Sequence, residues 1–189
     1  MKKLLGLLAL VLLFGLPTMA QDTTPVFEVG GGFQYRSFDT PLSNRLNMAG
    51  WFVTANYNVN RWLGVAAQFD GTRSDKGPNG TWNDYGFMFG PQIYPFGHHT
   101  VTPFFHVLLG GSHVNVSFPA DPINELPALT ETDSAFSFEG GGGVDWTITK
   151  HFGVRLGELD YEQQRFFGAN PVQHNYKFSA GVVVRFGEK

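Results

Sequence analysis

The 189-residue chain contains no cysteine, which excludes both a disulfide framework and lipid attachment at an N-terminal cysteine. It also lacks an excess of basic residues, because 13 Lys and Arg stand against 16 Asp and Glu and the net charge is −3. Nucleic-acid binding usually requires a basic surface, so the composition disfavours nucleic acid as a partner. After residue 20, no apolar run approaches the roughly 20 residues of a membrane-spanning helix.

The first residues of the chain have the composition of a secretory signal. A basic start (residues 2–3) precedes an apolar stretch (4–16), and residues 18–20 form a small-x-small cleavage site. An uncleaved membrane anchor is the alternative, but the apolar stretch is short for a spanning helix. We therefore expect residues 1–20 to be a cleaved signal peptide and residues 21–189 to form one exported domain.

What the chain has in abundance is aromatic residues and glycine, with 19 Phe, 6 Tyr, 4 Trp and 24 Gly. Aromatic residues favour β-strands, and glycine permits sharp bends and close approach of backbones. The pattern is clearest in residues 175–186, where apolar residues alternate with polar or small ones and only Val183 departs from the rule. A period of two places the two sets on opposite faces of a β-strand.

Similar alternation divides the chain into eight stretches with connections that are alternately long and short. The stretches are 26–38, 48–59, 62–72, 82–94, 101–116, 134–147, 152–164 and 175–186. Short turns at one rim and longer loops at the other are typical of transmembrane barrels. We therefore predict an all-β fold, an eight-stranded antiparallel up-and-down transmembrane β-barrel. A soluble barrel of the lipocalin type is the alternative, and it would place the apolar face inside.

The polar faces of these stretches carry charges that a soluble barrel would bury at high cost. If the apolar faces meet lipid, the charges can instead pair within the lumen. The predicted lumen charge network comprises Glu28, Arg36, Glu139, Asp145, Arg155, Glu158, Asp160, Lys177 and Arg185. Because opposite charges are nearly balanced in this set and eight strands leave little internal space, we favour a closed plug over a polar conduit.

One stretch departs from the pattern and needs a local explanation. Val154 and Leu156 share their parity with three acidic residues (158, 160 and 162), which would place carboxylates in lipid. A β-bulge near Gly157 would turn the acids inward; extension of this half-strand beyond the bilayer is the alternative.

Six Trp and Tyr residues near strand ends are candidates for the aromatic girdles at the membrane interfaces. They are Tyr35, Tyr57, Trp62, Trp82, Tyr94 and Trp146.

The C-terminal sequence SAGVVVRF resembles the assembly signal of outer-membrane barrels, with Ser179, Gly181, Val184 and Phe186 in its four defined positions. Residues 102–114, 140–146 and 152–166 also resemble strands of small outer-membrane barrels of the OmpA and OmpX types. This resemblance implies a monomer in the bacterial outer membrane that contacts lipid and lipopolysaccharide. It also implies insertion by the outer-membrane barrel assembly machinery.

The sequence gives little indication of catalytic or metal chemistry. The glycine clusters 30–32 and 140–143 are followed by strand rather than by the helix that a phosphate loop needs, and no histidine pair has a metal-ligand spacing. His113 and Ser117 share a predicted strand face, but no third group orients them. We therefore expect neither an enzyme, nor a cofactor, nor a metal site.

By resemblance, the expected role is in envelope structure or surface interaction. A narrow solute channel and a lipid-modifying outer-membrane enzyme are the alternatives. The longest connection carries four acidic residues, which we expect to be solvated although they could bind divalent cations; they are Asp121, Glu125, Glu131 and Asp133.

Overall fold

The computed structural model describes residues 24–40, 45–77, 80–120, 127–166 and 172–188. These residues form eight strands and contain no helix that could cross a membrane. The strands are β1 (Pro25–Asp39), β2 (Arg45–Asn58), β3 (Leu63–Gly77), β4 (Gly80–Ile93), β5 (Val101–Phe118), β6 (Leu129–Thr149), β7 (Phe152–Phe166) and β8 (Gln173–Glu188). The expected signal peptide, residues 1–20, lies outside the described residues.

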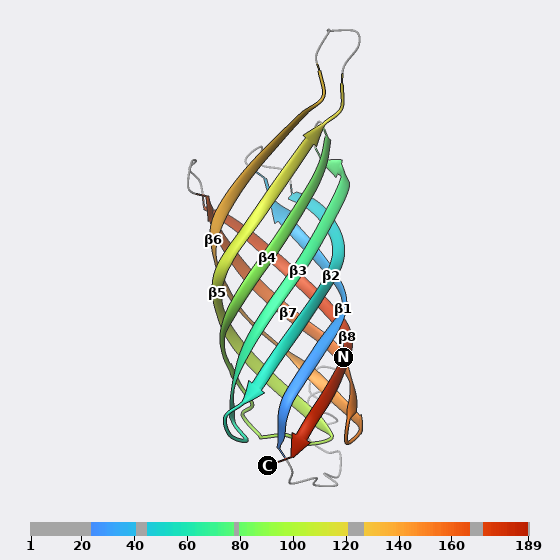
Figure 1. Cartoon of the computed structure of the whole chain (residues 1–189), viewed down its shortest axis with the longest axis vertical. Coiled ribbons are helices and arrows are strands. Elements are labelled where there is room, and N and C mark those ends of the chain that lie inside the picture. The colour runs from blue at the N-terminus through green and yellow to red at the C-terminus, as the bar shows by residue number, and fades with distance from the viewer. Residues whose placement is uncertain (1–23, 41–44, 78–79, 121–126, 167–171, 189) are drawn as a thin grey trace, which may run out of the picture.

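Each strand pairs antiparallel with its neighbour in sequence, and β8 pairs with β1 to close the barrel. The closing pair runs from Pro25 opposite Glu188 to Ser37 opposite Tyr176. β1 therefore begins, and β8 ends, at the rim that carries the turns after β2, β4 and β6 (Figure 1). The structure thus confirms the predicted fold class.

The apolar side of the strands faces outward over the whole wall of the barrel. Phe27, Phe33, Phe87 and Phe89 are each more than half exposed, whereas polar residues such as Gln34 are fully buried. This arrangement is the inverse of a soluble protein, and lipid is the solvent that stabilises it. The lipocalin-type alternative is therefore wrong.

The strands extend further at the long-loop rim than the sequence pattern predicted. β3 and β4 continue until only residues 78–79 separate them, and β6 begins at Leu129 rather than near residue 134. Glu131 and Asp133, expected in a loop, thus belong to a strand, and Asp121 and Glu125 lie outside the described residues. The β5–β6 hairpin stands above the ends of the other strands (Figure 1).

The predicted bulge in β7 is present. Arg155 pairs with Gly181 and Glu158 with Ser179, so β7 has one more residue than β8 between these two pairs. The extra residue restores the inward orientation of the acids that follow, while Leu156 and Leu159 are both exposed to the outside. A single inserted residue therefore keeps carboxylates away from lipid.

Candidate functional site

The barrel interior is the most highly organised polar region of the described chain. All nine residues of the expected charge network are buried there. Three further acids that were not assigned to it, Asp70, Asp84 and Glu162, are buried with them. The nine expected residues are nearly balanced in charge, but the described interior as a whole contains eight buried carboxylates and four buried Lys or Arg residues.

Arg36 is the centre of the first group of ion pairs. Its Nη2 lies 2.9 Å from Asp70 Oδ1 and 3.3 Å from Glu162 Oε2, and its Nη1 donates to Asp84. Gln164 adds a donor to Asp84 at 3.0 Å. All four charged side chains have no exposure to solvent, so the charges compensate one another instead of being hydrated.

Lys177 joins this group to the strands on the far side of the lumen. Its Nζ lies 3.0 Å from Asp70 Oδ2 and also contacts Glu139. Gln68 donates to both carboxylates at 3.3 Å. Asp70 thus accepts from two cations, and the network crosses the barrel through side chains that water does not reach.

Arg155, next to the bulge, forms a second group. It donates to Asp145 Oδ1 at 2.9 Å and to Glu158 Oε2 at 2.6 Å. Its guanidinium also lies over the ring of Phe104, 4.4 Å from the centroid. A cation–π contact and two carboxylates together offset the desolvation of this arginine.

A third group closes the interior near the short-turn rim. Glu28 accepts from Arg185 Nε at 2.7 Å and from the Tyr94 hydroxyl at 2.6 Å, and Asn56 contacts that hydroxyl at 2.5 Å. Tyr94 was expected in an aromatic girdle, but it is 1% exposed and points inward. Its parity with Gln92, which is also buried, gives the reason.

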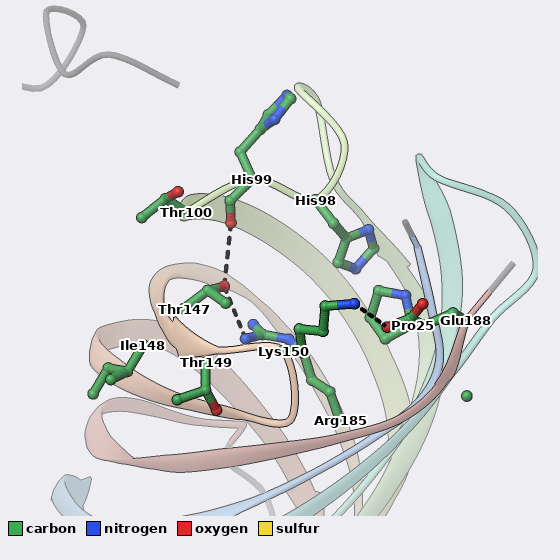
Figure 2. A pocket seen from close by; sticks show the side chains of 11 residues that line it. Pro25, His98, His99, Thr100, Thr147, Ile148, Thr149, Lys150, Arg185 and Glu188 are labelled. Carbon is green, nitrogen blue, oxygen red and sulfur yellow. Dashed lines mark hydrogen bonds and ion pairs between the residues drawn. The ribbon is translucent and has the colours of Figure 1, made fainter. Parts of the chain in front are cut away.

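A cavity of about 230 Å³ lies beside this group at the short-turn rim. Figure 2 shows His98, His99, Thr147 and Arg185 around it, with the Thr147 hydroxyl joined to the His99 carbonyl. Arg185 Nη1 donates to the same hydroxyl at 2.9 Å. Arg185, which pairs with Glu28, thus forms part of the wall of this cavity.

Toward the long-loop rim the interior becomes apolar, whereas the sequence pattern predicted polar residues there. Phe38, Leu46, Met48 and Val114 form a buried cluster, and Trp82 packs against it. The assignment of Trp82 to an aromatic girdle was therefore wrong. The other four girdle candidates, Tyr35, Tyr57, Trp62 and Trp146, are exposed on the outer surface.

The four residues of the assembly-signal pattern are divided between the two faces, with Ser179 and Gly181 on the lumen side and Val184 and Phe186 on the outer side. Ser179 points into the lumen and donates to Gln34 at 3.3 Å, whereas Phe186 is 51% exposed on the outside. Gly181 pairs with Gly32 of β1, and Val184 pairs with Val29. The motif therefore forms the β8 side of the closing strand pair.

His113 and Ser117 each contact a residue of β6 rather than each other. His113 is exposed and its Nδ1 lies 3.0 Å from Ser134 Oγ on β6, whereas Ser117 contacts Thr130. His106, on the opposite face, is buried among Glu139, Glu158 and Asp160. Spacing along the chain could not reveal this cluster, because three strands supply its members.

Comparison with known proteins agrees with this architecture. Residues 6–186 match the profile of the outer membrane protein β-barrel domain family. No curated protein sequence is significantly similar to this chain.

Solved structures of three outer-membrane proteins have similar folds. Neisserial surface protein A is 16% identical, with a TM-score of 0.70 over 85% of this chain and 97% of that one. Ail, the attachment invasion locus protein of Yersinia pestis, is 16% identical, with a TM-score of 0.65 over 86% and 99%. OprG of Pseudomonas aeruginosa is 12% identical, with a TM-score of 0.54 over 87% and 97%. The chain therefore belongs to the outer membrane protein β-barrel domain family and is a protein of the bacterial outer membrane.

Proposed function

We propose that this protein is a closed, non-enzymatic barrel that holds β-hairpins at the cell surface for interaction with external molecules. The observation that carries the proposal is the length of the β5–β6 hairpin. Its pairing continues to Phe118 opposite Leu129, well past the aromatic and aliphatic wall of the barrel. Longer loops face the outside of the cell in barrels of this class, so the hairpin reaches away from the membrane.

The exposed residues of this hairpin give it a surface suited to recognition. Leu129 is 54% exposed, and Glu131 and Asp133 add acidic groups close to it on the same strand. The end of this two-stranded stem therefore exposes an apolar side chain beside charged ones to an external partner. The similar fold of Ail, whose name describes attachment and invasion, is consistent with such a role.

The interior supports the same proposal, because its buried charged side chains argue against a transport channel. Arg36, Asp84, Glu139 and Lys177 have side chains with no solvent exposure, and an open bore would require hydrated groups. Ion pairs across the lumen link strands on opposite sides of the barrel. A barrel linked in this way is a suitable base for a projecting hairpin.

The experiment compares a deletion strain carrying the wild-type gene with one carrying a triple variant, Leu129→Ser, Glu131→Ser and Asp133→Ser. Binding of the cells to immobilised host-cell matrix proteins should fall in the variant, while detergent resistance is unchanged. If instead deletion reduces detergent resistance and both genes restore it, with no difference in binding, the role is in envelope structure.

The expected partners follow from the same placement. We propose that the barrel is a monomer in contact with outer-membrane lipid and lipopolysaccharide, and that the assembly machinery recognises Ser179, Gly181, Val184 and Phe186. We further propose that residues 1–20 are removed on export.

A lipid-directed hydrolase is the second candidate function, and one contact favours it. The His113–Ser134 pair adjoins a hollow of about 450 Å³ on the lipid-facing wall, lined also by Phe69, Phe87 and Phe136. Nucleophilic serine needs such a histidine, but among the described residues no carboxylate hydrogen-bonds to His113. Turnover of lipid A by the wild type that Ser134→Ala abolishes would support this function; absence of turnover removes it.

A further inference from the structure

Three neighbouring strands bring one imidazole and two carboxylates together inside the barrel. His106 Nε2 on β5 lies 3.1 Å from Asp160 Oδ1 on β7 and 3.6 Å from Glu139 Oε1 on β6. The three side chains are at most 4% exposed. Each can offer one ligand atom, and these atoms all lie within 4.8 Å of one another.

Gly141 allows the side chains of His106 and Asp160 to come this close. It is the register partner of His106 on one side and of Asp160 on the other. A Cβ atom at position 141 would lie 1.9 Å from Asp160 Oδ1, so any side chain there would displace the carboxylate. The glycine thus leaves a space over β6 in which His106 and Asp160 approach each other.

This cluster contains the one buried carboxylate of the described chain that has no Arg or Lys within ion-pair distance. Every other buried carboxylate of the described chain lies within ion-pair distance of an Arg or a Lys, as Glu139 does with Lys177. Among the described residues, Asp160 lies within ion-pair distance of His106 alone, and neither of its oxygens accepts a hydrogen bond of normal geometry. His106 Nε2 is likewise without a hydrogen-bond partner. Buried polar atoms in this condition require an explanation, and a bound ion is one.

We propose that His106, Glu139 and Asp160 bind a divalent transition-metal ion such as Zn²⁺ or Mn²⁺. One imidazole nitrogen with two carboxylate oxygens is a ligand set that such ions accept. Ligand atoms about 2.1 Å from an ion at tetrahedral angles are separated by about 3.4 Å. The two distances from His106 Nε2, 3.1 Å and 3.6 Å, are close to that separation.

The surrounding groups orient the ligands as a metal site requires. His106 Nδ1 lies 3.5 Å from Glu158 Oε1, and metal-binding imidazoles commonly direct their second nitrogen to a carboxylate. Arg155 in turn holds Glu158. Glu139 is held by Lys177 and Gln68. The ion would offset the excess of carboxylates and stabilise the closed interior.

The site is enclosed, so the test supplies the metal while the barrel forms. The denatured protein is folded into detergent micelles with Zn²⁺, Mn²⁺ or Ca²⁺ in separate samples, and folding is verified by heat-modifiable migration on a gel. After removal of free ion, elemental analysis should find about one Zn²⁺ or Mn²⁺ per folded barrel. His106→Gln and Asp160→Asn should retain at least about tenfold less. The control His113→Gln, on the lipid-facing side of the same strand, should retain as much as the wild type.

A folded wild-type barrel without bound Zn²⁺ or Mn²⁺ overturns the proposal. Equal retention by His106→Gln also overturns it, as does retention of Ca²⁺ alone, since Ca²⁺ prefers oxygen ligands. If both variants fail to fold, binding of Co²⁺ to the wild-type protein tests the site instead. A visible absorption band of tetrahedral Co²⁺ supports the site, and its absence from folded protein contradicts it.

Discussion

Arg36 on β1 and Lys177 on β8 are direct register partners across the strand pair that closes the barrel. Like charges opposite each other destabilise a sheet, and both of these are fully buried. Asp70 offsets the repulsion, because its two oxygens lie 2.9 Å from Arg36 and 3.0 Å from Lys177. Closure between the first and last strands therefore depends on a carboxylate from β3, across the lumen.

Replacement of Arg36 should test this dependence. Arg36→Met removes the partner of Asp84 and Glu162 and leaves buried carboxylates uncompensated, which we expect to cost about 3–5 kcal/mol of unfolding free energy. Urea titration in micelles, followed by tryptophan fluorescence, measures the change. Arg73→Met is the control, because the Arg73–Asp75 pair is exposed and should contribute little. Equal stability of the two variants would contradict the argument.

The barrel should not conduct ions. Side chains with no solvent exposure cross the lumen, and eight strands leave room for side chains and little else. We expect flat current traces after insertion of purified protein into planar bilayers, with a general porin as the positive control. Reproducible conductance steps from the wild type would mean that the charge network opens.

The seam between β1 and β8 should not tolerate a side chain at Gly181. A Cβ atom there would lie 2.2 Å from the carbonyl oxygen of Gly31, whereas one at Gly140 would meet nothing within 4 Å. Gly181→Ala should therefore destabilise the barrel by about 1–3 kcal/mol, while Gly140→Ala should have little effect. The fraction of heat-modifiable protein at increasing urea concentration compares the two. A similar loss in both would show that seam geometry is not the cause.

Deletion of single residues should reveal the function of the β7 bulge. Removal of Leu156 takes out the extra residue, keeps Arg155 and Glu158 on the inside and should permit folding. Removal of Leu159 makes Glu158 and Asp160 adjacent, so that at least one of these carboxylates points toward lipid. This orientation costs on the order of 2 kcal/mol or more. Folding yield in phospholipid vesicles measures both. Equal yields would indicate that this strand adjusts its register freely.

Much of the fold could be predicted because the signal is local. Alternation over residues 175–186 predicts which side chains meet lipid, and Val183, the exception, is buried in the lumen. The parity of the acids after Leu156 was sufficient to predict a bulge. Tyr94 and Trp82 were misplaced because their position near strand ends was given more weight than their parity. Strand ends at the long-loop rim were misjudged because polar residues there also form paired strands.

The sequence by itself determined that the chain forms strands with one apolar and one polar face, because a period of two is a property of neighbouring residues. Only the tertiary structure decided which interior groups meet. Arg36 lies 34 positions from Asp70, and His106 meets Asp160 only because Gly141 stands between them in register. Such contacts depend on strand register and on the curvature that brings distant strands together across the lumen. No pattern within one strand encodes either of these.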